Sequence, residues 1–132
     1  MTKPRILVVD DDPSLCRLLK MTIEKCGRFE VRSENLACSV LRVAREFKPD
    51  MFLLDVDMPG RDGGETAVAL RADPEFANVP ILFLTALVSE HEAGIRAVVR
   101  GGMRFLAKPV NPQALLHEIR SSLNEAILIQ AA

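Results

Sequence analysis

The sequence predicts an α/β fold in which one parallel β-sheet lies between two layers of helices. Short apolar runs alternate with amphipathic helical segments along all 132 residues, so that a strand followed by a helix occurs five times. Such alternation requires right-handed crossover connections and places helices on both faces of the sheet. Several of the strand segments are also apolar without a break, as expected of strands that are buried on both faces.

In the first half of the chain, the pattern predicts strands at residues 6–9, 29–32 and 51–54. Asp12 and Pro13 supply an N-cap and a first-turn proline for the first helix, and Gly27 is placed to end that helix. Its apolar face is expected to contain Leu15, Leu18, Leu19 and Ile23. A second helix, which ends before Pro49, is expected to bury Leu36, Val40, Ala44 and Phe47.

In the second half, residues 58–64 are rich in turn formers and predict a loop, which a helix at residues 65–71 follows. Strands are predicted at residues 80–84 and 103–107. Between them, Ser89 is expected to cap a fourth helix. Asn111 and Pro112 repeat the signal of a cap followed by proline, and the last helix has an apolar face of Leu115, Leu116, Ile119, Leu123 and Ile127.

The composition fits one globular domain over residues 1–132 and argues against nucleic-acid binding. Hydrophobic residues make up 48% of the chain and charged residues 27%, which is ordinary for such a domain. The net charge of −1, from 17 basic and 18 acidic residues, provides no broad basic surface for a phosphate backbone. The absence of Trp and Tyr removes most of the stacking surfaces that single-strand binders use.

The N-terminus and the cysteines indicate a cytoplasmic protein without membrane contact. The first residues, MTKPR, do not resemble a signal peptide, and no run of 18 apolar residues is present. Cys16, Cys26 and Cys38 lack the spacing of a metal site or a disulfide framework, and we interpret them as reduced packing thiols on helices.

Polar residues stand at the carboxyl ends of four of the five predicted strands. Asp10 and Asp11 follow the first strand, Asp55 the third, Thr85 the fourth and Lys108 the fifth. Because ligands of open parallel sheets bind beyond the carboxyl ends of the strands, these side chains are expected to meet at one edge.

The chemistry of this group predicts Mg²⁺-dependent phosphoryl transfer onto a carboxylate. Two like charges about 4 Å apart cost about 4 kcal/mol at an effective dielectric constant of 20, so three converging carboxylates need a cation or protons. Mg²⁺ prefers oxygen ligands, Mn²⁺ could replace it, and the lack of His and Cys argues against zinc. Lys108 and Thr85 are typical partners of a transferring phosphoryl group, and an aspartate between them can act as the nucleophile.

Four motifs in this order resemble the receiver domain of two-component response regulators. They are ILVVDDDP at residues 6–13, LLDVDMPG at 53–60, LTA at 84–86 and FLAKP at 105–109. The resemblance extends from about residue 5 to residue 123. It implies a flavodoxin-like (βα)5 three-layer sandwich with the strand order 2-1-3-4-5. It also implies phosphorelay signal transduction by a phosphorylated switch rather than a turnover enzyme.

The resemblance assigns a role to each site residue. Asp55 is the expected phosphoacceptor, which takes the phosphoryl group from a sensor histidine kinase or a histidine phosphotransfer protein. The expected Mg²⁺ ligands are Asp11 directly, Asp10 mainly through water, Asp55 and the backbone carbonyl of Asp57. Lys108 is expected to pair with the phosphoryl oxygens, and its bond to Pro109 is expected to be cis.

The resemblance also implies a conformational switch. Thr85 is expected to move toward the phosphoryl group and Phe105 to follow it inward, although Phe105 could also be an ordinary core residue. The surface made by the helix after Ser89, the strand at residues 103–107 and the last helix would then bind a downstream effector or form a homodimer.

Two alternatives stay open at this point. Asp55-Val56-Asp57 resembles the Asp-x-Asp motif of haloacid dehalogenase-type phosphohydrolases, but there the motif comes first and the acidic pair last, the reverse of the order here. A pseudo-receiver that is not phosphorylated and acts as a scaffold is the other alternative, although such domains tend to lose one of the site residues.

Overall fold

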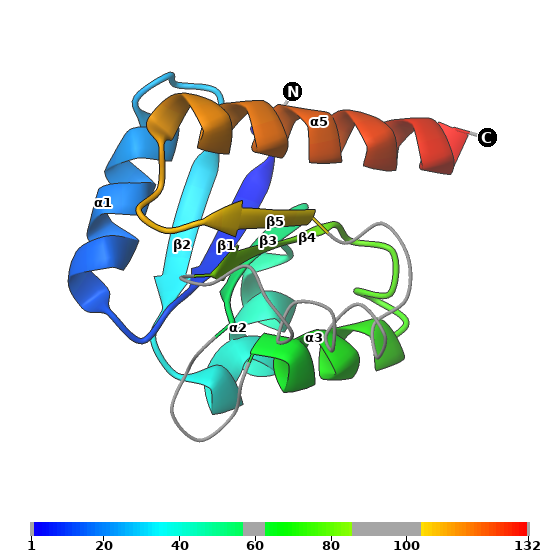
Figure 1. The fold of residues 1–132 in the computed structure, drawn as a ribbon. Helices are drawn as coiled ribbons and strands as arrows, with labels where there is room; N and C mark the ends of the chain where they lie inside the picture. The colour runs from blue at the N-terminus through cyan, green and yellow to red at the C-terminus, as the bar shows by residue number, and fades with distance from the viewer. Residues whose placement is uncertain (1, 57–62, 86–103, 132) are drawn as a thin grey trace.

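The computed structural model describes residues 2–56, 63–85 and 104–131, which contain a twisted parallel sheet with helices on both sides (Figure 1). The strands are β1 (Arg5–Val9), β2 (Glu30–Glu34), β3 (Met51–Asp55), β4 (Ile81–Thr85) and β5 (Arg104–Ala107). The helices are α1 (Pro13–Glu24), the short 3₁₀-helix η1 (Ala37–Ser39), α2 (Val40–Phe47), α3 (Gly63–Ala72) and α5 (Pro112–Ala131). The helix predicted after Ser89 lies outside the described residues.

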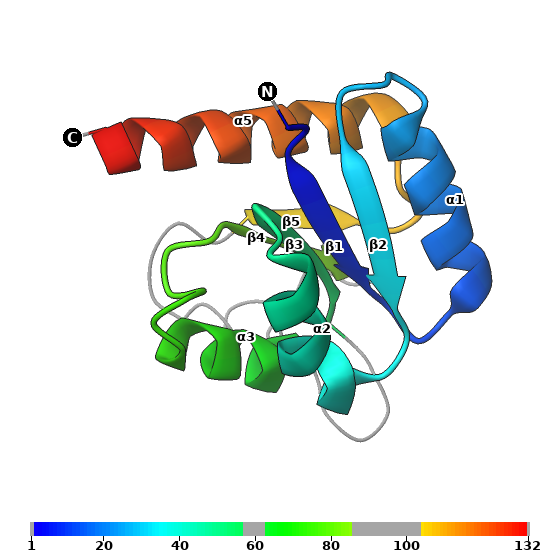
Figure 2. The same ribbon diagram turned by 180° about the vertical axis from the view of Figure 1, so that it is seen from behind.

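The strand order β2-β1-β3-β4-β5, with every neighbouring pair parallel, confirms the predicted fold class. The helices α1 and α5 cover one face of the sheet, and α2 and α3 cover the other (Figures 1 and 2). Alternate residues of a strand therefore enter different cores. In β1, Ile6 and Val8 pack with α1 and α5, whereas Leu7 and Val9 pack with residues of α2 and α3.

The central strands are buried along their whole length, as their unbroken apolar runs predicted. Every residue of β3 and β4 is buried, whereas in the edge strand β2 only Val31 is buried. The edge strand also starts one residue later than predicted and ends two residues later. Its length is set by backbone pairing with β1, from Arg5 opposite Glu30 to Val9 opposite Glu34, which the apolar residues alone do not mark.

The predicted helix caps are present. The Asp12 side chain accepts hydrogen bonds from the backbone N–H groups of Ser14 (2.9 Å) and Leu15 (3.4 Å) at the start of α1. The Asn111 side chain does the same at the start of α5, with distances of 2.9 and 3.0 Å. Gly27 has a φ of +74°, the left-handed conformation that lets the chain turn after α1.

Four local predictions were wrong. Leu18 and Leu36 are each 60% exposed, so neither belongs to the buried face of its helix. The segment before α2 forms the 3₁₀-helix η1 rather than the first turn of an α-helix. Gly63 and Gly64 begin α3 instead of ending a loop, and the Gly63 N–H donates to the carbonyl of Val56 at 2.8 Å, which joins the start of this helix to the end of β3.

The cysteine prediction was right for one residue and wrong for two. All three cysteines are free, as predicted. Cys16 is buried in α1, but Cys38 is exposed in η1, and Cys26 is exposed in the turn after α1.

None of the helices in the described part of the chain has the length and apolarity that crossing a bilayer requires.

Candidate functional site

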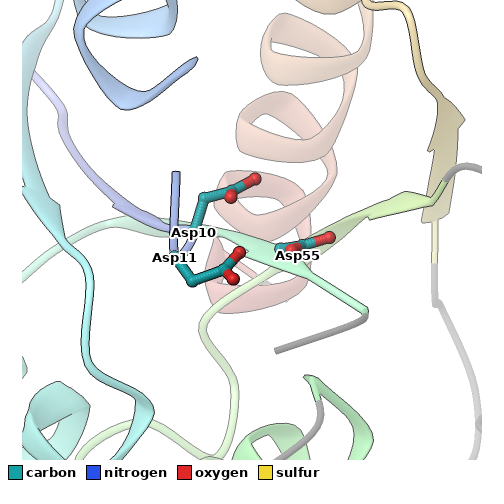
Figure 3. A group of neighbouring side chains, drawn as sticks. All are labelled: Asp10, Asp11 and Asp55. Carbon is teal, nitrogen blue, oxygen red and sulfur yellow. The ribbon is translucent and has the colours of Figure 1, made fainter. Parts of the chain in front are cut away.

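The structure brings Asp10, Asp11, Asp55, Thr85 and Lys108 to the carboxyl edge of the sheet. Asp55 and Thr85 are the last residues of β3 and β4, and the other three follow directly after β1 and β5. Figure 3 shows the side chains of the two consecutive aspartates extending toward that of the third. One carboxylate oxygen from each of the three lies within 4.8 Å of the others. Asp57, the predicted source of a carbonyl ligand, lies outside the described residues.

The site combines buried and exposed acids. Asp10 is completely buried and Asp55 is 4% exposed, whereas Asp11 is exposed. The backbone around both buried acids continues the hydrogen bonding of the sheet: the Asp10 N–H donates to Glu34, and the Val56 N–H donates to Leu84. The positions of these two carboxylates are therefore set by backbone that is paired with the neighbouring strands.

Lys108 joins the two buried carboxylates. Its Nζ donates to Asp10 Oδ2 at 3.0 Å and to Asp55 Oδ1 at 3.1 Å. Its backbone N–H donates to the carbonyl of Thr85 at 2.8 Å, and its bond to Pro109 is cis, as the resemblance implied. The last strand of the sheet therefore delivers an ammonium group between acids that come from the first and third strands.

The electrostatics of the site favour a bound cation. Burial of Lys108 acts to lower its pKa, but the hydrogen bonds and charges of Asp10 and Asp55 outweigh burial and hold the pKa above its usual value. The ammonium is therefore charged at neutral pH and balances one acid of the three. The donor set consists of carboxylates, which are hard oxygen ligands, and it fits Mg²⁺.

Gly63 supports the site in a way that the sequence pattern did not indicate. A Cβ added to it would lie 2.4 Å from the backbone carbonyl oxygen of Asp55 and 3.0 Å from Cα of Val56. The start of α3 therefore packs directly against the end of β3, and only a residue without a side chain fits there.

Two further residues next to the acids were missed. Asn35, just after β2, donates through Nδ2 to the backbone carbonyl of Asp10 at 2.8 Å. The thiol of Cys16 donates to the same oxygen at 3.4 Å, and burial, together with the charge of Asp10, raises the pKa of this thiol to about 11. No sequence motif marks either contact: Asn35 lies after β2, 25 residues beyond Asp10, and the Cys16 contact depends on how α1 packs beside the end of β1.

Phe105, the predicted switch residue, is partly buried in β5. Its ring stacks on Phe83 of the neighbouring strand β4, with the ring centroids 5.1 Å apart and the planes 22° apart. It also packs against the core between the sheet and the helices α2 and α3. Its side chain thus contacts the strand that ends in Thr85.

A five-stranded doubly wound sheet with an acidic cluster, a threonine and a lysine at its carboxyl edge has the features of a receiver domain. The sequence profile of the response regulator receiver domain matches residues 6–120, and the chain belongs to this family. Receiver domains act in phosphorelay signalling and are generally not turnover enzymes. Membership in this family argues against the haloacid dehalogenase alternative.

Known relatives include both short and long proteins. The chain is 34% identical to protein PilH of Pseudomonas aeruginosa in an alignment of 119 residues, which covers 90% of this chain and 97% of PilH. It is 31% identical to RpaA of Synechocystis, a DNA-binding transcriptional regulator, in an alignment of 129 residues. This alignment covers 98% of this chain and 53% of RpaA. The DNA-binding response regulator MtrA of Mycolicibacterium smegmatis is 35% identical over 92% of this chain and 51% of MtrA. The chain thus spans about half the length of RpaA and MtrA.

Solved structures show the same fold. The chemotaxis protein CheY4 of Vibrio cholerae matches with a TM-score of 0.84 and 28% identity, over 92% of this chain and 99% of CheY4. A response regulator structure from Chloroflexus aurantiacus matches equally well, over 93% of this chain and 99% of that protein.

Proposed function

We propose that Asp55 accepts a phosphoryl group from the phosphohistidine of a sensor histidine kinase or a histidine phosphotransfer protein, in a reaction that depends on Mg²⁺. The observation that supports this most directly is the position of the Lys108 ammonium, 3.0 and 3.1 Å from the Asp10 and Asp55 carboxylates. We further propose that residues 1–132 form one receiver domain and work in the cytoplasm, the usual location of such domains.

In the proposed step, a carboxylate oxygen of Asp55 attacks phosphorus and forms a new O–P bond. The P–N bond to the imidazole breaks, and the nitrogen keeps the bonding electron pair and takes up a proton as the imidazole leaves. The product is an acyl phosphate on Asp55. Lys108 balances the negative charge of the phosphoryl oxygens, since its ammonium already lies beside the acceptor oxygen.

The metal would be held by the carboxylates of Asp10, Asp11 and Asp55 and by the backbone carbonyl of Asp57. Bound Mg²⁺, or Mn²⁺ in its place, would neutralise the phosphoryl oxygens as they approach the acids. Without a cation, an incoming dianionic group would face three carboxylates and one ammonium. The chain would assist its own phosphorylation and dephosphorylation without turning over a substrate.

Phosphorylation would change the surface that other proteins bind. Thr85 is 3% exposed at the end of β4, and Phe105 stacks on the same strand through Phe83. We propose that the Thr85 hydroxyl moves to hydrogen-bond the phosphoryl group and that Phe105 moves inward with it. The surface formed by the helix after Ser89, β5 and α5 would then bind a downstream effector protein or a second copy of the chain, without direct binding of nucleic acid.

Incubation with Mg²⁺ and acetyl phosphate, followed by intact mass spectrometry, tests the proposal. We expect one added phosphoryl group, which hydroxylamine removes and which is absent without a divalent cation. Asp55→Asn is expected to abolish the mass increase. Asp50→Asn, just before β3 and so at the other end of the same strand, is expected to keep it. No mass increase in the unsubstituted chain, or an increase that persists in Asp55→Asn, would contradict the proposal, and the first result would favour the scaffold alternative.

A further inference from the structure

Glu34 and Asn35, at the end of β2, form hydrogen bonds with both polar groups of the Asp10 backbone, its N–H and its carbonyl. The Asp10 N–H donates to the carbonyl of Glu34 at 3.2 Å. The Asp10 carbonyl accepts from Nδ2 of Asn35 at 2.8 Å and from the thiol of Cys16 at 3.4 Å. Nδ2 of Asn35 also lies 3.4 Å from the Cys16 sulfur, so the three groups form one small network between β1, α1 and β2.

This network matters most for the neighbouring Asp11. No hydrogen bond to another residue in the described part of the chain restrains the Asp11 carboxylate, and the residue is exposed. The direction of its side chain therefore depends on the two peptide groups that flank it. One is held through the Asp10 carbonyl by Asn35, and the other is held through the Asp12 N–H, which donates to Asp10 Oδ1 at 3.0 Å.

We propose that Asn35 is a positioning residue of the metal site, which fixes the peptide between Asp10 and Asp11 and so directs the Asp11 carboxylate toward Asp10 and Asp55. Cys16 is a second, weaker donor to the same carbonyl. This inference rests on the proposed function, because the role of Asn35 is defined toward the bound Mg²⁺. Asn35 donates to the Asp10 backbone and to Cys16, and we assign it no direct contact with the metal or the phosphoryl group.

The role proposed for Asn35 concerns the placement of the acidic side chains and not their charge. Asn35 is neutral, so its replacement leaves the charges of the site unchanged and alters only how well the carboxylates are placed. Residues that orient metal ligands typically change metal affinity by about 10-fold or more when they are replaced. We therefore expect Asn35→Ala to weaken Mg²⁺ binding about tenfold while the salt dependence of binding stays the same.

The test measures Mg²⁺ affinity by isothermal titration calorimetry and stability by urea unfolding. Asn35→Leu accompanies Asn35→Ala because it keeps the side-chain volume without a donor, and both are expected to bind Mg²⁺ about tenfold more weakly. At saturating Mg²⁺, both are expected to be phosphorylated by acetyl phosphate at nearly the rate of the unsubstituted chain. The matched control is Asp50→Ala, which removes another 2.8 Å side-chain hydrogen bond to the backbone, at Arg5 on the far edge of the sheet. It is expected to lose stability and keep its Mg²⁺ affinity.

Each outcome has one meaning. Mg²⁺ affinity within about twofold of the unsubstituted chain in both Asn35 variants would overturn the inference and leave the proposed function standing. An equal loss of affinity in Asp50→Ala would overturn it too, because the effect would then follow stability alone. Failure of the unsubstituted chain to bind Mg²⁺ would overturn the proposed function and the inference together.

Discussion

Replacement of Lys108 by Met is expected to destabilise the protein in the absence of divalent cations. The substitution keeps an unbranched side chain but removes the ammonium that lies 3.0 Å from Asp10 and 3.1 Å from Asp55. The side chains of these two acids are 1% and 5% exposed, so little water reaches them to take the place of the lost partner. They would then face each other and Asp11 without a balancing charge.

The size of the effect follows from these distances. At an effective dielectric constant of 20, a contact of this length corresponds to about 5 kcal/mol of Coulomb attraction, which desolvation of the charges partly cancels. Removal of one partner of a buried ion pair typically costs about 3–5 kcal/mol. Because the Lys108 side chain is 25% exposed, we expect the low end, about 3 kcal/mol of unfolding free energy at neutral pH.

Urea unfolding followed by far-ultraviolet circular dichroism measures this loss, since the chain has no Trp for fluorescence. Lys108→Arg, which keeps the charge, is expected to lose much less stability. Saturating Mg²⁺ is expected to stabilise Lys108→Met more than the unsubstituted chain, because the cation takes over the balancing of the acids. A loss below about 1 kcal/mol without Mg²⁺, typical of an exposed ion pair, would refute the reasoning, and so would an equal response of both proteins to Mg²⁺.

Three further predictions concern stability and the support of the site. Gly63→Ala is expected to cost about 1–3 kcal/mol and to slow phosphorylation by acetyl phosphate, because the new Cβ would lie 2.4 Å from the Asp55 carbonyl oxygen and displace the acceptor. Lys48→Gly is expected to raise the unfolding free energy by about 1 kcal/mol, since Lys48 ends α2 in the left-handed conformation with φ 56° and ψ 63°. Stability is expected to fall as the pH rises from 9 to 11. Burial raises the pKa of the Cys16 thiol from its ordinary value of 9.0 to about 11 in the folded chain. The unfolded chain therefore loses this proton at a lower pH, which favours unfolding across this range. The loss amounts to about 2–3 kcal/mol, and Cys16→Ala is expected to remove it.

Unfolding curves test all three, and each has its own contradicting result. If acetyl phosphate phosphorylated Gly63→Ala as fast as the unsubstituted chain, the added Cβ would not displace Asp55, and the reasoning from this contact would be wrong. A lower unfolding free energy in Lys48→Gly would show that the lysine side chain contributes more than its backbone conformation costs. The same decline above pH 9 in Cys16→Ala would assign it to other groups.

The sequence predicted the strands of the sheet because the central strands follow from local composition, whereas their order followed only from the resemblance to receiver domains. Residues 51–54 are apolar and become fully buried in β3, and the caps at Asp12 and Asn111 need only a few neighbouring residues. The edge strand β2 was placed less well, because its length depends on pairing with β1 and most of its side chains are exposed. Tertiary packing also decided that Leu18 is exposed, although its spacing fits the buried face of α1.

The acids and the lysine of the site were predicted because each follows a recognisable strand, and parallel strands bring their carboxyl ends together. Asn35 and Gly63 were not predicted as supports of the site. Their contacts with the Asp10 carbonyl and the Asp55 carbonyl are made by side-chain geometry and close backbone approach between separate elements. No local pattern of residue types records such contacts.

The position of Lys108 in the chain has a consequence for the order of folding. Its ammonium balances acids that come 98 and 53 residues earlier, and it reaches them only when β5 pairs with β4. During synthesis, the first and third strands leave the ribosome well before this residue does. A partly made chain therefore presents its acids without their lysine, and like charges at the ends of β1 and β3 repel one another. Addition of the last strand places one positive charge between two of these acids and reduces their repulsion, so electrostatics and strand pairing both favour the pairing of β5 with β4.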